Sequence, residues 1–478
     1  MKGSFRHLLL PAACALALLA GCADMGKVKP QATQLKAADL NAGGAITAAS
    51  ANIAWPDAQW WAALHDEQLN QLVAAALSDS PTLHAALARV RQAEALAGVS
   101  KAATGPRVDA AASSTRQLYA AHSTIPAPLA GNYAWMNNAA LSGSYDLDLW
   151  GRNRDALAAA LDEVHLAAAE SQMARLTLET SIVRTYIQLS LEYTLQDSVT
   201  DNLAQRQRIL EITRRRKAAG LASDIEVISI ETTLPAGRRE HEQHGEAIAL
   251  LRNQLAALIG KGPGDGDTIV RPTLTLSTAH DRVPADLPAE LVGRRPDIVA
   301  QRWRVEAAGA RIDAAKKDFY PNINLSAFIG QQSLGFGHFL ESGSQTRGIA
   351  PAISLPIFDG GRLRSQLGNQ TAIYDIAVEQ YNATVIQALS DVAGALVKID
   401  SVKQQDQLAQ RALTSARRQQ QLAEKAYASG LTDSLNVINA QLTLLNEQQQ
   451  MAQVASKQLD NFALLMSALG GGIKLDLD

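Results

Sequence analysis

The sequence predicts a mixed α and β fold made of two copies of one unit, in which two strands are followed by a long helical hairpin. At Leu141–Arg152, apolar and polar residues alternate and then give way to helical spacing. The same change recurs at Ile353–Arg362, and Gly361 follows Gly151 by 210 residues. We therefore expect a strand to run into a helix, without a loop, at both places.

The duplication extends along most of the chain. Pro81 and Pro106 are 25 residues apart, as are Pro296 and Pro321, at an offset of 215. Further on, matching positions lie 210 residues apart: Arg152 and Arg362, Gly220-Leu221 and Gly430-Leu431, Gly260 and Gly470. Self-similarity at a fixed offset indicates repeated structural units. The offset changes between Pro106 and Gly151, so an insertion should lie in a loop there.

The composition suits long packed helices and argues against a nucleic-acid partner. Of the 478 residues, 5% are aromatic, while Ala, Leu and Gln are abundant. The formal net charge is −3, and no basic stripe with interleaved aromatic residues is present. Nucleic-acid binding is therefore set aside.

The N-terminus has the order of an export signal that ends in a lipidation site. Basic residues precede an apolar core, and Leu19-Ala20-Gly21-Cys22 follows it. This order resembles bacterial lipoprotein signals, so residues 1–21 should be removed and Cys22 should carry lipid. An ordinary secretory signal with an incidental cysteine is the alternative. Since Cys14 would leave with the signal, no disulfide could form.

The mature chain should divide into nine segments. In order, they are a lipid anchor and extended tether (22–54), first-repeat N-terminal helices (55–106), two strands (107–150), a first long helical hairpin (151–262), a linker and short helix (263–295), a second-repeat helix (296–320), two strands (321–360), a second long helical hairpin (361–470) and a tail (471–478). No apolar run after the signal reaches the ~18 residues of a membrane-spanning helix, so strands must do any spanning.

Four segments have about the ten-residue length of a tilted strand that crosses a bilayer. They are Arg107–Tyr119, Ala134–Trp150, Asn322–Gln331 and Gly348–Phe358. Soluble hairpins are the alternative, but four matching strands in an exported lipoprotein favour the membrane. Four strands cannot close a barrel, because the smallest membrane barrels have about eight and an open edge cannot face lipid. The barrel should therefore be shared between chains.

The predicted helices are unusually long. Arg152–Ala219 contains no proline, and its length at about 1.5 Å per residue is roughly 100 Å. Arg362–Ser429 matches it, and its apolar residues recur by threes and fours as in a coiled coil. Gly220 and Gly430 should end these helices and reverse the chain.

The returning helices carry start signals and one break signal. The predicted caps are Ser223 with Glu226 as a capping box in the first copy, and Thr432 or Asp433 in the second. Pro235 aligns with Leu445 of the second copy. It should bend only the first returning helix, because proline lacks the N–H that a helix interior needs.

No catalytic constellation is present in the sequence. His241 and His244 are three residues apart instead of the four of a helix-borne zinc motif, so both should lie on a solvated surface. Neither a Ser-His-Asp pattern nor a phosphate-binding loop occurs, and the six Met form no cluster. We expect no enzyme, no metal and no cofactor other than the lipid on Cys22.

The combined motifs resemble the TolC-type outer-membrane efflux ducts, in the NodT-like lipoprotein branch. The resemblance covers nearly all of the mature chain. It rests on the lipobox, the duplicated unit, Arg295-Pro296-Asp297, Phe319-Tyr320-Pro321, the Leu-Pro-Ile-Phe-Asp-Gly-Gly run at 355–361 and the two Gly-Leu tips.

This resemblance implies a homotrimer whose 12-stranded barrel crosses the bacterial outer membrane and continues as a periplasmic helical tunnel. It also implies two partners, a periplasmic adaptor protein and an inner-membrane transporter, and a cargo of drugs or other small toxic molecules. The exit duct of a protein-secretion system shares the architecture and is the alternative. A coiled-coil scaffold without a pore is a third possibility, which the amphipathic strands argue against.

Two sets of site residues follow from the resemblance. Adaptor hairpins dock at the tips in this family, which points to Gly220-Leu221 and Gly430-Leu431. The family's gating acid falls six or nine residues after the tip glycine, where this chain has Asn436 and Asn439. Glu226 is the acidic candidate in the first copy, although its capping role is favoured. We therefore expect a gate without a ring of acids.

Overall fold

A computed structural model describes residues 25–41, 43–51, 55–122, 124–276, 283–284 and 287–473. The predicted signal, the lipidation site at Cys22 and most of the predicted tail lie outside these residues. The chain divides into two compact units. The first comprises Met1–Gln34, Val90–Ala167 and Gln301–Tyr381, and the second comprises the remainder of the chain.

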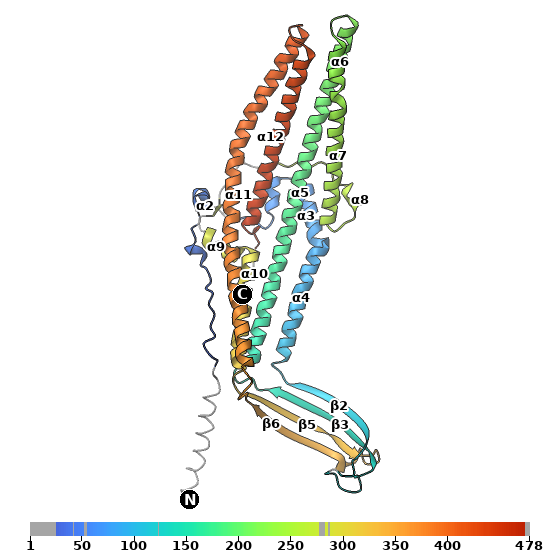
Figure 1. Ribbon diagram of the computed structural model, residues 1–478, viewed down its shortest axis with the longest axis vertical. Helices are drawn as coiled ribbons and strands as arrows, with labels where there is room; N and C mark the ends of the chain where they lie inside the picture. Colours follow the sequence, from blue (N-terminus) through green and yellow to red (C-terminus); the bar gives the residue numbers. More distant parts are fainter. Residues whose placement is uncertain are drawn as a thin grey trace. The chain divides into compact units, whose positions relative to one another are not determined.

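The helices and strands follow the predicted order (Figure 1). The α-helices are α2 (Gly43–Ala49), α3 (Glu67–Asp79), α4 (Pro81–Ala102), α5 (Arg152–Ala218), α6 (Asp224–Glu231), α7 (Thr233–Leu258), α8 (Pro263–Gly266), α9 (Leu287–Arg294), α10 (Pro296–Lys317), α11 (Arg362–Ala428) and α12 (Ser434–Ala468). The strands are β1 (Ser50–Ala51), β2 (Arg107–Leu118), β3 (Tyr133–Asp146), β4 (Val283–Pro284), β5 (Asn322–Leu334) and β6 (Gln345–Ser354), and the 3-10 turns are η1 (Ala37–Asp39), η2 (Trp60–Leu64) and η3 (Ser342–Ser344).

The repeat is visible in the lengths of these elements. Helices α4 and α10 have 22 residues each, and α5 and α11 have 67 each. The long helices end within one residue of the predicted positions. None of the helices in the described ranges is both long and apolar enough to cross a membrane.

The first unit contains a four-stranded antiparallel sheet of order β2-β3-β5-β6. The second strand of the first copy pairs with the first strand of the second copy, as in Leu141 opposite Ile329. Strands β2 and β6 are the edges, so each has a row of backbone N–H and C=O groups without a strand beside it in the chain.

Four predicted strand ends are wrong by three or four residues, and so is the expectation of a strand that enters a helix without a loop. Strand β5 continues to Leu334 instead of ending at Gln331, and β6 begins at Gln345 instead of Gly348. Strand β3 ends at Asp146 instead of Trp150, and β6 ends at Ser354 instead of Phe358. A turn of five residues, with Asp148 at φ 39° and Gly151 at φ 82°, precedes α5. The apolar alternation continues through these turns, which is why the sequence pattern overran the strands.

In the second unit, the tips are built as predicted. Gly220 and Gly430 have φ of 75° and 73°, which favours glycine. Leu221 N–H donates to Arg216 O at 2.8 Å, and Leu431 N–H donates to Ala426 O at 2.9 Å. The chain therefore reverses through the same glycine turn in both hairpins.

The returning helices differ as the proline predicts. Ser223 and Glu226 form a capping box at the start of α6, and Asp433, not Thr432, caps α12. The first returning helix is interrupted at Thr232, three residues before Pro235, whereas α12 runs unbroken through Leu445. Pro235 has no backbone N–H to donate within the helix, and its ring clashes with the carbonyl group of the preceding turn, so the helix is interrupted there.

Candidate functional site

The four-stranded sheet has one apolar and one polar face. Side chains alternate between faces along a strand, and the register places every second residue of each strand on the same face. The apolar face contains Val108, Ala110, Leu141, Tyr145, Ile323, Leu325, Ile329, Ile349 and Ile353, and the polar face contains Asp109, Ser113, Thr115, Asn138, Ser142, Ser144, Asn324 and Ser326.

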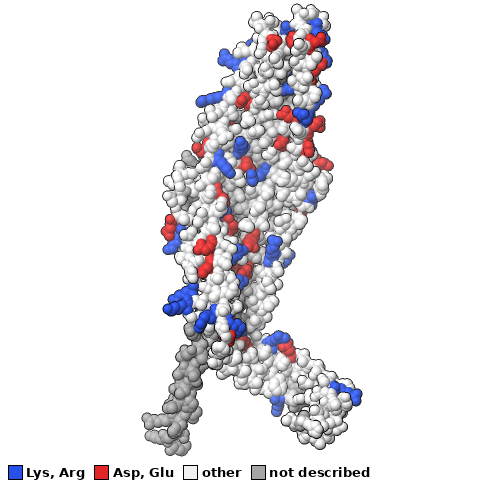
Figure 2. Space-filling view, in the orientation of Figure 1, with Lys and Arg blue, Asp and Glu red and all other residues white. Residues whose placement is uncertain are grey.

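The apolar face is exposed. Four of its eight large side chains, Val108, Leu141, Ile349 and Ile353, are more than half exposed. Figure 2 shows few charged side chains over the sheet in comparison with the helices. An alternation of apolar and polar faces in strands of this length is typical of strands that line a membrane pore.

The two tips expose the leucines proposed for docking. Leu221 is 68% exposed and Leu431 is 82% exposed, although both belong to ordered turns. Nothing lies within 4 Å of a Cβ built on Gly220 or Gly430, so the glycines are required by backbone conformation and not by close packing. The leucines therefore contribute little to the fold of the chain itself.

The three candidate gate residues differ in their hydrogen bonds and in their position on the helices. Asn436 Nδ2 donates to Thr432 Oγ1 at 2.6 Å, so its amide is used in the capping turn. Asn439 is exposed one turn further along α12. Glu226 Oε1 accepts from Ser223 N–H at 3.1 Å, in the capping role that the sequence favoured, and its Oε2 lies 3.5 Å from Ser434 Oγ of the other hairpin.

Sequence reasoning missed a polar contact between the two hairpins near their tips. Buried Tyr427 has its hydroxyl 2.9 Å from Thr213 Oγ1. The Arg216 guanidinium lies 4.6 Å from the centre of the Tyr427 ring and donates to Tyr427 O at 3.0 Å. Tyr427 aligns with Lys217 of the first copy, so an aromatic residue stands where the other copy has a charged one. That difference is the only sign of this contact in the sequence.

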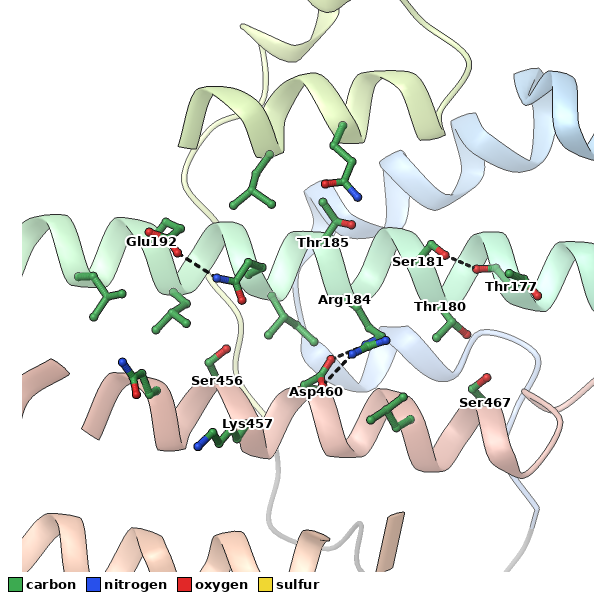
Figure 3. A pocket seen from close by; sticks show the side chains of 18 residues that line it. Thr177, Thr180, Ser181, Arg184, Thr185, Glu192, Ser456, Lys457, Asp460 and Ser467 are labelled. Atoms are coloured by element: carbon green, nitrogen blue, oxygen red, sulfur yellow. Dashed lines mark hydrogen bonds and ion pairs between the residues drawn. The ribbon is translucent and has the colours of Figure 1, made fainter. Parts of the chain in front are cut away.

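A polar groove of about 910 Å³ between α5, α7 and α12 was also missed. Figure 3 shows Arg184 on α5 pointing toward Asp460 on α12 across the groove. Arg184 Nε donates to Asp460 Oδ1 at 2.6 Å, and Nη2 donates to Oδ2 at 3.2 Å. The hydrogen bonds that Arg184 donates to Asp460 hold the pKa of Arg184 above its ordinary value, so the guanidinium stays charged.

The groove opens on one face of these helices. Residues 60–66, called the N-terminal segment below, contact the opposite face. Tyr186, two residues after Arg184 on α5, donates to Asp66 Oδ1 at 3.0 Å. Phe462, two residues after Asp460 on α12, contacts Trp60 with ring centres 6.1 Å apart. Residues two apart on a helix point to opposite sides. The groove therefore lies on the side away from the N-terminal segment.

The arrangement offers no evident reaction centre. Within the described ranges, no group of three or more His, Cys, Asp and Glu side chains is placed to hold a metal ion. The prediction of a solvated surface is wrong for His244, whose side chain is only 16% exposed and whose Nδ1 lies 2.8 Å from Glu192 Oε2. An amphipathic antiparallel sheet joined to long helical hairpins instead defines the class of outer-membrane duct proteins.

The comparisons with known proteins identify the family. The protein-family model whose description is "Outer membrane efflux protein" matches residues 72–261 and 287–471 of the sequence. The chain therefore belongs to the outer membrane efflux protein family, as the sequence motifs predicted. It is an outer-membrane channel of an efflux system and not an enzyme.

Two curated relatives carry resistance names. The chain is 43% identical over 362 residues to the fusaric acid resistance protein FusA of Burkholderia cepacia, covering 74% of this chain and 67% of that one. It is 31% identical over 463 residues to the multidrug resistance outer membrane protein MdtP of Escherichia coli strain K12, covering 95% and 94% of the two chains.

Solved structures agree in fold. The outer membrane protein VceC of Vibrio cholerae superposes with a TM-score of 0.82 at 36% identity, covering 87% of this chain and 100% of that chain. The CmeC outer membrane channel of Campylobacter jejuni has a TM-score of 0.86 at 20% identity, covering 94% and 96% of the two chains. The second likeness concerns the fold alone.

Proposed function

We propose that three copies of the chain close a 12-stranded barrel in the outer membrane, continued by a periplasmic tunnel of the long helices. The observation that carries this proposal is the sheet, which has an apolar face and two open edges, β2 and β6. An open edge in lipid leaves backbone groups without partners, at several kcal/mol each. Pairing β6 of one chain with β2 of the next removes every edge, and three chains give twelve strands.

The cargo is proposed from the names of the relatives, and the partners are proposed from the resemblance to the efflux-duct family. The chain exports small toxic organic compounds, because its relatives are named for resistance to fusaric acid and to multiple drugs. A periplasmic adaptor docks at the exposed tip leucines, and an inner-membrane transporter supplies the energy. The polar groove around Arg184 and Asp460 faces the tunnel lumen, since the N-terminal segment covers the other side of the same helices.

The barrel is tested with a substitution in the middle of the sheet. A Cβ on Gly330 of β5 would lie 2.4 Å from Ala139 O of β3, which no real side chain tolerates. We expect Gly330→Val to abolish the trimer in native mass spectrometry and the conductance in planar bilayers, with helical circular dichroism largely kept. Gly343→Val is the matched control, because nothing lies within 4 Å of its Cβ.

Two results would contradict the shared barrel. One is a homogeneous monomer of the unmodified protein that still conducts ions. The other is a Gly330→Val protein that forms trimers and conducts like Gly343→Val.

Lipid anchoring at Cys22 is a separate proposal, supported by the small residues directly before this cysteine and the apolar core upstream. Intact mass spectrometry of the purified protein should show a chain that starts at Cys22 and carries acyl chains. Cys22→Ala should remove that added mass. An unmodified chain that starts at another residue would show that the signal is an ordinary secretory one.

A further inference from the structure

We propose that the junction between the sheet and the helices holds the headgroup of an anionic phospholipid, whose acyl chains lie along the apolar face of the sheet. The inference rests on the proposed membrane-spanning barrel. A cavity of about 330 Å³ lies at this junction. It is lined by the start of β5, the end of β6 and the first residues of α5 and α11.

The cavity is continuous with the apolar face of the sheet. Ile323 lines the cavity and lies opposite Ile353 on that face. Leu325, two residues further along β5, points to the same side. A ligand with a polar head in the cavity therefore has an apolar surface beside it for a hydrocarbon chain.

Arg362 is the basic residue of this cavity whose guanidinium N–H groups are available to a ligand. Its side chain is 68% exposed, and its ion pair with Asp359 spans 4.0 Å, the outer limit of such a contact. The Asp359 carboxylate already accepts from Gly361 N–H at 3.0 Å and Leu363 N–H at 2.9 Å at the start of α11. A guanidinium has five N–H donors in a fork that matches a phosphate group.

The other two basic residues of the lining are already matched by carboxylates. Arg152 lies 3.3 Å from Asp146 and 3.5 Å from Asp318. Lys317 is ion-paired with Asp155. Arg362 is therefore the basic residue of the lining whose contact with a carboxylate is longest.

The rim of the cavity has the side chains of a membrane interface. Trp150 stacks on Tyr320 with ring centres 5.0 Å apart, and its Nε1 donates to Pro321 O at 2.8 Å. Ile357 is 73% exposed and Phe358 is 90% exposed, directly before the helix that carries Arg362. Aromatic residues gather at the headgroup level of membrane barrels. The acyl chains of an anionic phospholipid fit the apolar rim, and its phosphate group fits the guanidinium of Arg362.

Lipid titration of the full-length protein tests the site. Delipidated protein in detergent is titrated with phosphatidylglycerol or with phosphatidylcholine of the same acyl chains, and bound lipids are counted by native mass spectrometry. We expect phosphatidylglycerol to bind more tightly and Arg362→Gln to weaken it about fivefold, since one basic residue near an anionic lipid surface contributes ~1 kcal/mol. Arg362→Lys should retain most of this preference.

The matched control is Arg347→Gln, an exposed arginine on the apolar face of β6 opposite Ile329, away from the cavity. It should leave lipid binding unchanged. Equal effects of Arg362→Gln and Arg347→Gln, or no preference for phosphatidylglycerol, would overturn the proposal. Trimer mass and conductance are measured on the same samples, so a failure of the barrel itself is recognised separately. Inorganic phosphate that competes fully with the lipid would show an anion site without a lipid.

Discussion

Replacing both tip leucines, as in Leu221→Ser with Leu431→Ser, should abolish drug tolerance in cells while leaving the yield of trimer unchanged. Both side chains are largely exposed, so their loss costs the chain little stability. Burial of a leucine in a partner's surface contributes about 1.5–3 kcal/mol to the free energy of binding, and a serine at the same position loses most of this contribution. Adaptor affinity should therefore fall at least tenfold for each type of tip.

The control for this experiment comes from the same chain. Leu340, in the loop between β5 and β6, is 86% exposed, much like Leu431. In the proposed topology this loop lies outside the cell, beyond the reach of a periplasmic adaptor. Leu340→Ser should therefore leave drug tolerance and adaptor binding intact. Normal efflux by the double tip variant, or equal loss with Leu340→Ser, would exclude docking at these turns.

The repeated parts of the fold could be predicted because local rules determine them. Gly220 and Gly430 end the long helices, Ser223 with Glu226 starts a helix, and Pro235 interrupts one. Each of these effects acts within a few residues, so each can be recognised from the sequence alone. The strand ends were predicted less well, because the turn at Asp148 continues the apolar alternation of the strand.

Contacts between the two copies could not be predicted in the same way. Arg184 aligns with Gly394 and Asp460 aligns with Leu250, so the ion pair across the groove breaks the repeat. A contact between distant segments depends on how the hairpins pack, which no local pattern specifies.

Arg295 belongs to a motif that the sequence shows, but its contacts with distant segments could not be predicted. The Arg-Pro-Asp run identified the position, but only the structure shows what the arginine does. It is largely buried and donates to Asp297, Asp391 and Ala468 O at 2.6 to 3.2 Å. Although burial opposes its charge, the hydrogen bonds with Asp297 hold the pKa of Arg295 above its ordinary value. The motif therefore joins α10 to α11 and to the end of α12.

The second large effect concerns the proposed gate. In a trimer, the exposed Asn439 of α12 would recur three times around the pore, without charge. An amide can donate and accept hydrogen bonds there, but it does not concentrate cations. We therefore expect the unmodified channel to be only weakly cation-selective and poorly blocked by divalent cations.

Asn439→Asp should increase both properties strongly. A carboxylate ~6 Å from a monovalent cation in water attracts it by roughly 0.7 kcal/mol. Three carboxylates together contribute about 2 kcal/mol, so they can raise the local cation concentration about thirtyfold before salt screening. Reversal potentials across a salt gradient in planar bilayers and titration with a divalent cation measure the two effects.

Glu226→Gln is the matched control, because glutamine can keep the capping box with Ser223 while the acid is lost. It should change selectivity and block little. Strong divalent block in the unmodified channel that disappears in Glu226→Gln would instead place an acidic gate in the first repeat. Asn439 would then have only a neutral role at the constriction, since the acid of the other hairpin would already control the passage of cations.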